Sequence, residues 1–354
     1  MTTLSEDRLL HLVDSMEGRP VVAVADLVAD RFVTGIPKRI SREAPVLILQ
    51  YQGETFSPGG GANAIANIAA LGGKPLPLGI VGDDDSGREI TQAFRSQGID
   101  VSGIIQRAGY RTPTKTRILA GGQHSIKQQI VRYDVEDHLS LAPRERDHFQ
   151  ATLSSWKRQS SVAIFSDYGY GVADPDLLPV VRSALAENST VLCDSRYRLQ
   201  AFAGLDAATP NEQEAEALSK VFDQVDQIDQ IEASDPQTFT ETGKQLLARL
   251  QARFLLITRG SSGMVLFEGG QALSLPVHGT DQLADVTGAG DTVIATVALA
   301  MAAGADPTEA AVLANYAAGI VVMKMGTATL HAAELKQAIC ADSKPIAEAV
   351  WAAY

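Results

Sequence analysis

The sequence predicts an α/β fold in which a doubly wound, mostly parallel sheet lies between helices. Short apolar runs recur along the chain, at residues 21–26, 161–167, 190–194 and 254–258. Continuous apolar runs of this length are typical of strands buried on both faces of a parallel sheet. Helical segments follow most of these runs, and this alternation of strand and helix is what a doubly wound fold requires.

The first elements are a helix and a strand. Apolar side chains recur at helical spacing within residues 4–16, so we expect a helix packed outside the first strand, 21–26. Several of the strand-like runs end in a polar residue. Ligands of open α/β sheets gather at the carboxyl ends of the strands, so these residues should face one crevice. They are Asp26, Asp167, Asp194 and Thr258.

Two stretches interrupt the alternation. Residues 32–56 and 112–133 resemble strand pairs without a helix between them, which predicts a small separate sheet projecting from the core. No Pro-, Gly- or Ser-rich linker divides the 354 residues. We therefore predict a single domain over residues 1–354 with the strands of the small sheet inserted into it.

The segment 284–304 places a carboxylate and free backbone amides at the start of an apolar helix. Gly288 and Gly290 leave the first-turn N–H groups open to a ligand, and those amides together with the helix dipole favour a phosphate. Asp291 would lie beside such an anion, where it could accept the proton of an attacking hydroxyl. The alternative is that the glycines form a tight turn and Asp291 caps a core helix.

A second glycine cluster, Gly59 to Gly61, also leads directly into a helix of small residues. One interpretation is that a polyhydroxylated ligand lies against Gly59, Gly60 and Gly61 while the Asn63 amide binds its hydroxyls. The alternative is a loop followed by close helix packing. For Asn67, one turn after Asn63, we expect a contact with water or with a neighbouring group.

The composition excludes several classes of partner. Thirty basic against 42 acidic residues give a formal charge of −12, which argues against nucleic acid or an anionic membrane surface. Cys193 and Cys340 are too few for a disulfide framework, so a reducing cytoplasm is the simplest compartment. The longest apolar run is too short to span a bilayer, and the first residues contain no signal-peptide core.

The two glycine segments resemble the two signatures of the PfkB (ribokinase-like) family of sugar and nucleoside kinases: GG-x-x-N before a helix, and GAGD near the C-terminus. Further matching segments, from ADLVADRFVTG at 25–35 to KMGTATL at 324–330, extend the resemblance over almost the whole chain. Within the family, the segments ISREAPV and SDY-x-x-G look most like the kinases of D-glycero-D-manno-heptose 7-phosphate. The resemblance implies a three-layer ribokinase-like fold whose small sheet covers the sugar as a lid and forms a homodimer surface.

The resemblance also implies a mechanism, in which the γ-phosphate of ATP passes to a sugar hydroxyl. Asp291 would accept the proton, while the backbone amides of Gly288, Ala289 and Gly290 hold the transferring group. Asn211 and Glu214 form an N-x-x-E pair that would bind Mg²⁺ indirectly. The same pair would also serve as a helix capping box, and the two uses are compatible.

The remaining expected roles come from matching positions. Asp26 would bind sugar hydroxyls bidentately, although it could instead cap a turn. Among the basic residues near the lid we favour Lys115, Arg117 and Arg132, because alternate strand residues share one face. The expected substrate-binding residues are Asp26, Gly59, Gly60, Gly61, Asn63, Lys115, Arg117, Arg132 and Asp167. The expected nucleotide-binding residues are Asn211, Thr258, Arg259, Gly260, Asn315 and Gly319. Asp285, Thr287 and the carbonyl of Gly326 would bind a monovalent cation such as K⁺.

The chain departs from the heptose kinases at two basic positions. Those enzymes typically have SDYAKG and D-P-K where this chain has SDYGYG and Asp194-Ser195-Arg196, so Tyr170 replaces a lysine. We therefore expect a substrate related to heptose 7-phosphate but bound differently, or a relaxed specificity. The alternatives are a kinase of another sugar or nucleoside, and a catalytically silent ligand sensor, against which the intact GAGD segment argues. The nucleotidyltransferase fused to some heptose kinases is not expected here, so at most the kinase step is encoded.

Overall fold

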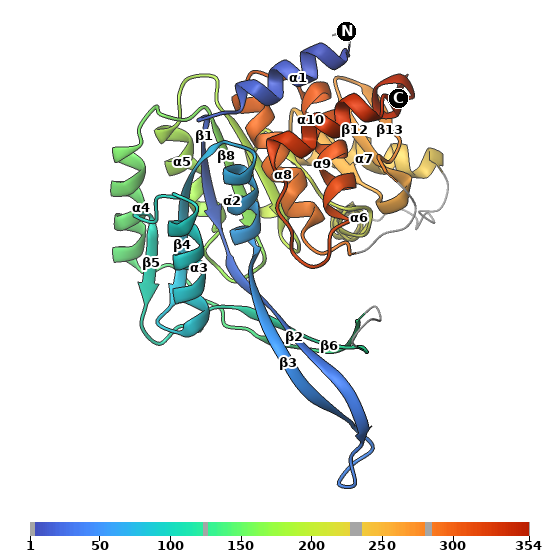
Figure 1. The fold of residues 1–354 in the computed structure, drawn as a ribbon. Helices are drawn as coiled ribbons and strands as arrows, with labels where there is room; N and C mark the ends of the chain where they lie inside the picture. Colours follow the sequence, from blue (N-terminus) through green and yellow to red (C-terminus); the bar gives the residue numbers. More distant parts are fainter. Residues whose placement is uncertain (1–3, 123–126, 227–235, 280–284, 354) are drawn as a thin grey trace.

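The computed structural model describes residues 4–122, 127–226, 236–279 and 285–353 (Figure 1). Its larger sheet has the strand order β14-β13-β12-β11-β10-β9-β8-β1-β4-β5. Neighbours from β11 to β5 pair in parallel, whereas β11 to β14 pair antiparallel. The strands are β1 Pro20–Ala25, β4 Lys74–Gly82, β5 Ile104–Arg107, β8 Val162–Asp167, β9 Thr190–Ser195, β10 Ala207–Ala208, β11 Phe254–Thr258, β12 Met264–Glu268, β13 Gln271–Leu275 and β14 Val350–Ala353.

Helices cover both faces of this sheet and bury two separate hydrophobic cores. Along β1, Val21 and Ala23 face one core while Val22 and Val24 face the other, as expected from strand alternation. One core contains α1 Glu6–Ser15, α2 Gly61–Ala70, α3 Asp85–Ser96, α8 Ala289–Ala302, α9 Pro307–Val321 and α10 Ala332–Ala341. The other contains α4 Pro143–Ser155, α5 Leu178–Ala184, α6 Glu212–Asp226 and α7 Pro236–Leu250. The three-layer, mostly parallel architecture predicted from the sequence is thereby confirmed.

The small sheet is also present, with the order β3-β2-β6-β7. Its strands are β2 Leu27–Ile40, β3 Leu47–Gly60, β6 Thr114–Ala120 and β7 Gln128–Val135. Figure 1 shows β2 and β3 extending as a long ribbon away from the helices, with β6 beside them. β2 starts and β3 ends nearer the core than expected. Gly59 and Gly60 pair with Val28 and Leu27, so these glycines belong to a strand and not to a loop.

No helix in the described part of the chain is both long and apolar enough to cross a membrane. Cys193 is buried and Cys340 is exposed, and both are free. The cytoplasmic location, the absence of nucleic-acid and membrane partners, and the single domain over residues 1–354 stay predictions.

Candidate active site

The N-terminus of α8 opens toward the carboxyl ends of the central strands. Gly288 precedes the helix with φ 82°, and a Cβ there would lie 2.6 Å from Asn63 Nδ2, so only glycine fits. A Cβ on Gly290 would meet nothing nearer than Asp194 Oδ2 at 3.5 Å. The first-turn amides have no carbonyl partner within the helix, and open space lies beside them, so the site fits a phosphate group.

Asp291, in the first turn of α8, is 2 % exposed and hydrogen-bonded through both carboxylate oxygens. Tyr168 Oη donates to Oδ1 at 2.8 Å, and Asn63 Nδ2 donates to Oδ2 at 3.1 Å. Burial raises the pKa of Asp291 to about 7, although these two hydrogen bonds oppose the rise. A carboxylate poised near neutral pH is suited to accept a proton as a general base.

The orientation of Asn63 is fixed by Asn67, one helical turn later. Asn67 Nδ2 donates to Asn63 Oδ1 at 3.1 Å, which leaves the Asn63 NH₂ group to face Asp291. The carbonyl oxygen of the Asn67 side chain accepts the N–H of Leu330 at 3.1 Å. In this structure Asn63 therefore positions the carboxylate, and Asn67 contacts neighbours as expected. A contact of Asn63 with sugar hydroxyls stays a prediction.

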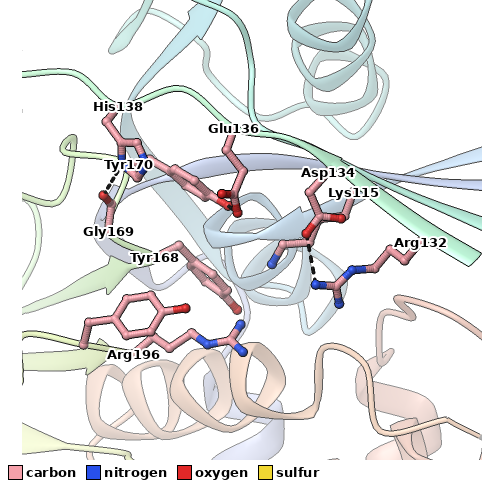
Figure 2. Close-up of a pocket in the computed structure, with 10 residues that line it drawn as sticks. Lys115, Arg132, Asp134, Glu136, His138, Tyr168, Gly169, Tyr170 and Arg196 are labelled. Atoms are coloured by element: carbon pink, nitrogen blue, oxygen red, sulfur yellow. Dashed lines mark hydrogen bonds and ion pairs between the residues drawn. The ribbon is translucent and has the colours of Figure 1, made fainter.

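A pocket of about 230 Å³ lies beside Tyr168, between the lid and the loops that follow β8 and β9 (Figure 2). Three cations point into it, Lys115, Arg132 and Arg196. Arg132 pairs with Asp134 at 3.0 Å, whereas Lys115 and Arg196 have no ion pair within the described residues. The lining consists of Lys115, Arg132, Asp134, Glu136, His138, Tyr168, Gly169, Tyr170, Arg196 and Tyr197. With Arg132 paired to Asp134, the charges of Lys115 and Arg196 exceed that of the remaining carboxylate, Glu136, so the lining carries a net positive charge that favours an anionic ligand.

The three lid cations expected from the sequence share one face of the small sheet. Arg132 lies directly opposite Arg117 in the β6–β7 register, and Lys115 is two residues away on β6. Only Lys115 and Arg132 reach the pocket. Arg117 is 8 % exposed and forms an ion pair with Asp30 at 2.5 Å, so it orders the lid base.

Asp30 is a site residue that the sequence reasoning missed. It is 3 % exposed, accepts a hydrogen bond from Thr327 Oγ1 at 2.7 Å, and contributes to the raised pKa of Asp291. A Cβ on Gly59 would lie 2.4 Å from Asp30 Oδ2, so Gly59 leaves room for this carboxylate. The sequence feature that could have indicated Asp30 is a carboxylate directly after the apolar residues Leu27 to Ala29.

Asp26 does not face the crevice, contrary to expectation. Its side chain is fully buried, and its two oxygens accept the backbone N–H groups of the loop after β8. Those donors are Tyr168 and Tyr170 on Oδ2, both at 2.9 Å, with Val172 at 2.8 Å and Ala173 at 3.4 Å on Oδ1. Since no oxygen remains exposed, Asp26 organises this loop and the expectation that it binds sugar hydroxyls is wrong for this structure.

Asp167 is likewise engaged by the protein. Its carboxylate, 1 % exposed, binds the Arg198 guanidinium through two contacts of 2.8 and 3.1 Å and accepts from Ser195 Oγ at 2.7 Å. A substrate contact of Asp167 is therefore not supported. Gly60 and Gly61 serve close packing, since a Cβ would lie 2.8 Å from Val28 Cγ2 and 2.6 Å from Ala25 Cβ respectively. Ligand contacts of these glycines stay predictions.

The Asn211 and Glu214 pair forms a reciprocal capping box at the start of α6. Glu214 N donates to Asn211 Oδ1 and Asn211 N donates to Glu214 Oε2, both at 2.9 Å. Burial raises the pKa of Glu214, and burial together with Glu214 and Asp291 raises the pKa of Asp194 well above its usual range. Arg196 opposes the rise for Glu214, but no ion pair with either carboxylate is found among the described residues, and such crowded carboxylates fit a Mg²⁺ ion held through water or phosphate oxygens. No three metal-ligating side chains in the described segments are close enough to hold an ion directly.

The expected nucleotide residues lie in two places. Thr258 and Asn211 are brought together by a β-bridge, with Gly260 (φ 53°) two residues further on. The Arg259 guanidinium, however, binds Glu212 Oε1 at 3.0 Å and lies over the Phe239 ring at 4.0 Å. Its charge is already paired, so its contact with phosphate has no support in this structure.

Asn315 and Gly319, both on α9, fix the segment that follows β13. Asn315 Nδ2 donates to the carbonyl of Pro276 at 2.6 Å, and a Cβ on Gly319 would lie 2.4 Å from the carbonyl of His278. Asn315 is 2 % exposed, which argues against a direct adenine contact of its amide donor. Both residues therefore hold the backbone of residues 276–278 in place.

The three residues of the expected cation site are neighbours. Asp285 Oδ1 accepts the N–H of Thr287 at 2.9 Å, and Asp285 Oδ2 accepts the N–H of Gly326 at 3.1 Å. These bonds link the segment before α8 to the one after α9. Occupancy by a cation stays a prediction.

Tyr170, which replaces a lysine of the heptose kinases, is buried at the edge of the pocket. Its hydroxyl donates to Glu136 Oε1 at 3.2 Å, and its ring lies 5.5 Å from that of His138. Arg196, by contrast, is exposed and points into the pocket. One of the two altered basic positions therefore lacks its charge and the other retains it.

The sequence model of the pfkB family carbohydrate kinases matches residues 21–333. The bifunctional protein HldE of Mesorhizobium japonicum is 35 % identical over 353 residues, covering 97 % of this chain and 66 % of the relative. That of Paramagnetospirillum magneticum is 36 % identical over 355 residues, covering 99 % and 68 %. The chain thus spans about two thirds of the length of the curated relatives it matches.

Solved structures with the same fold include two sugar kinases. Phosphofructokinase-2 from Escherichia coli in complex with potassium superposes with a TM-score of 0.71 at 16 % identity, covering 92 % of this chain and 99 % of the other. Arabidopsis thaliana ribokinase complexed with ribose and ATP gives 0.69 at 19 % identity, covering 91 % and 99 %. At these identities the likeness establishes the fold alone.

Proposed function

The chain belongs to the pfkB family of carbohydrate kinases, and from that premise we propose that it phosphorylates a hydroxyl of heptose 7-phosphate or of a closely related sugar phosphate. The observation that carries this proposal is the buried Asp291 at the N-terminus of α8, beside a pocket lined by Lys115, Arg132 and Arg196. A base next to an anion-binding helix terminus supports phosphoryl transfer, and the cations support an anionic acceptor.

In the proposed reaction, the sugar hydroxyl gives its proton to Asp291 while its oxygen forms a bond to the γ-phosphorus. The bond to the β,γ-bridging oxygen breaks, and ADP leaves with that electron pair. The backbone amides at the start of α8 stabilise the transferring group because they already point at the developing charge. Asn63 keeps Asp291 oriented through the 3.1 Å hydrogen bond to Oδ2.

Mg²⁺ would be held near Asp194 and Glu214, where it would neutralise phosphate charge. Asn211 fixes Glu214 through the capping box, and Thr258 lies beside Asn211. On the sugar side, Asp30 is the carboxylate close enough to raise the pKa of Asp291, and a sugar hydroxyl would bind it by replacing the Thr327 hydroxyl on Oδ2. Lys115, Arg132 and Arg196 would bind the phosphate of the acceptor.

The acceptor is tested by steady-state kinetics with heptose 7-phosphate beside unphosphorylated hexoses, pentoses and nucleosides. We expect the highest kcat/KM for the phosphorylated sugar, and Arg196→Ala should lower that value by about 10-fold or more through the loss of a charge-assisted contact. Arg158→Ala, at an exposed surface arginine remote from the pocket lining, serves as the control. A preference for an uncharged substrate would exclude the sugar-phosphate acceptor and leave the kinase assignment standing.

A monovalent cation is the second expected ligand. If K⁺ binds among Asp285, Thr287 and the carbonyl of Gly326, it should order the segment before α8 and raise kcat. We expect higher activity in potassium chloride than in tetramethylammonium chloride at matched ionic strength. Equal activity in both salts would mean that the cation site is absent or dispensable.

We also propose that the lid sheet joins two copies of the chain. Large apolar side chains are exposed along it, including Ile40, Leu47, Tyr51 and Tyr133, and Ile40 lies directly opposite Leu47 in the β2–β3 register. Several exposed apolar side chains on one projecting element favour an interface. A second copy is the occupant favoured here because an isologous contact pairs the same patch with itself.

Light scattering after size exclusion should therefore give the mass of a dimer at micromolar concentration. The double variant Ile40→Glu/Tyr51→Glu should shift it to the monomer, whereas Val221→Glu, at an exposed apolar position on α6, should not. A monomeric parent protein would rule out the lid interface under these conditions.

A further inference from the structure

Tyr168 lies between the proposed base and the pocket. Its hydroxyl donates to Asp291 Oδ1 at 2.8 Å, while its ring forms part of the pocket lining together with Lys115 and Arg196 (Figure 2). Asp291 is not among the described residues that line the pocket. A sugar hydroxyl approaching this oxygen from the pocket therefore meets Tyr168 first.

Three elements hold the Tyr168 side chain in this place. Its backbone N–H is fixed by Asp26 Oδ2 at 2.9 Å, and the Lys115 ammonium lies 5.0 Å from its ring centroid as a cation–π contact. A Cβ on Gly60 would lie 3.2 Å from Tyr168 Cε2, so the glycine lets the ring approach the strand. The hydroxyl is thus aimed at Asp291 by the loop, the lid and β3 together.

The Tyr168 hydroxyl makes the same hydrogen bond to Asp291 Oδ1 that a sugar hydroxyl must make before it can react. A sugar hydroxyl can pass its proton to Asp291 only from hydrogen-bonding distance of a carboxylate oxygen. The second oxygen, Oδ2, is already occupied by Asn63. Burial and the neighbouring Asp291 raise the pKa of Tyr168 well above its usual range, so its hydroxyl stays protonated and acts as a donor.

We propose that Tyr168 is a positioning residue whose hydroxyl holds the place of the acceptor hydroxyl on Asp291 Oδ1 until a sugar enters. This inference rests on the proposed function, because it requires Asp291 to act as a base. When the sugar binds, its hydroxyl takes over the hydrogen bond. Its proton goes to Oδ1, its oxygen bonds to the γ-phosphorus, and ADP leaves with the electrons of the broken bond; Tyr168 keeps its proton throughout.

The arrangement also protects ATP when no sugar is bound. A water molecule could attack the γ-phosphate with help from Asp291 only by reaching the same oxygen. Because the Tyr168 hydroxyl occupies that position, the base is withheld from water while it remains poised for the sugar.

The test compares Tyr168→Phe with the parent, with heptose 7-phosphate as the acceptor. The acid limb of kcat/KM reports the pKa of Asp291 in the free enzyme, and we expect it to move upward by about one pH unit because a donor to the carboxylate is lost. The acid limb of kcat, which reports the sugar complex, should stay in place. ATP hydrolysis without sugar should rise several-fold.

Tyr316→Phe is the matched control, because it also removes a buried tyrosine hydroxyl, one that donates to the carbonyl of Asp342 away from the pocket lining, and its removal should shift neither limb. Tyr168→Met, which also lacks the hydroxyl, should change the kcat/KM limb and ATP hydrolysis in the same direction, so the result does not depend on the folding of one variant. If Tyr168→Phe leaves both ATP hydrolysis and the acid limb of kcat/KM unchanged, the proposal is overturned. A kcat of Tyr168→Phe lowered by orders of magnitude would also overturn it, because that result would indicate that Tyr168 itself relays the proton. A parent without sugar-dependent ADP formation would instead refute the proposed function.

Discussion

Asp291→Asn is expected to lower kcat by roughly 10²- to 10⁴-fold while ATP binding stays nearly intact, because general base catalysis contributes about that much. Asparagine keeps the size of the side chain but cannot accept the proton. Stopped-time assays of ADP formation with the sugar phosphate measure this loss, and equilibrium titration with ATP measures the retained binding.

The same base predicts the pH profile of the parent. With the pKa of Asp291 raised to about 7 by burial, the catalytically competent carboxylate is lost as the pH falls through neutrality. The kcat/KM of the parent should therefore fall on the acid side of about pH 7, a limb that Asp291→Asn should abolish.

Asp85→Asn is the matched control for this variant, since it removes an exposed first-turn carboxylate from α3. It should leave kcat unchanged, because any effect on the helix dipole is remote from the site. Turnover of Asp291→Asn within a factor of a few of the parent would reject the assignment of the base.

Asp26→Asn is expected to lower the free energy of unfolding by about 2–4 kcal/mol, because a buried carboxylate that accepts several backbone N–H groups loses acceptors and gains a misplaced NH₂. The loop that it organises carries Tyr168, so kcat should fall as well. Chemical denaturation followed by fluorescence measures the stability change, and steady-state kinetics measures the second effect.

A surface carboxylate provides the comparison. Asp100→Asn changes an exposed residue that accepts only the N–H of Ser102, a bond that asparagine can also accept, so unfolding should change by about 0.5 kcal/mol or less. If Asp26 bound the sugar instead, Asp26→Asn would raise KM and leave the denaturation curve unchanged.

Local patterns were sufficient to predict most of the fold. The apolar runs predicted strands β1, β8, β9 and β11, and the two stretches without helices predicted the lid. These features were predictable because the apolar pattern of a buried strand and the glycines at a helix start lie within a few consecutive residues. The strand ends were less predictable. Asp26 and Asp167 follow the same pattern as a ligand-binding residue, yet both are engaged by buried groups from other elements.

The sequence alone indicated the family, the glycine-led N-terminus of α8 and the carboxylate in its first turn, since the last two depend on residues 288–291 and their own helix. Only the tertiary structure decided which side chains meet that carboxylate. Tyr168 lies 123 positions away in the chain from Asp291, and Asn63 lies 228 positions away. It also decided that Asp30, and not Asp26, lies near the base, and that Arg196 points into the pocket. Which side chains contact a buried carboxylate depends on which hydrogen-bond donors lie near it once the helices and strands have packed, so residue spacing within one segment does not predict these contacts.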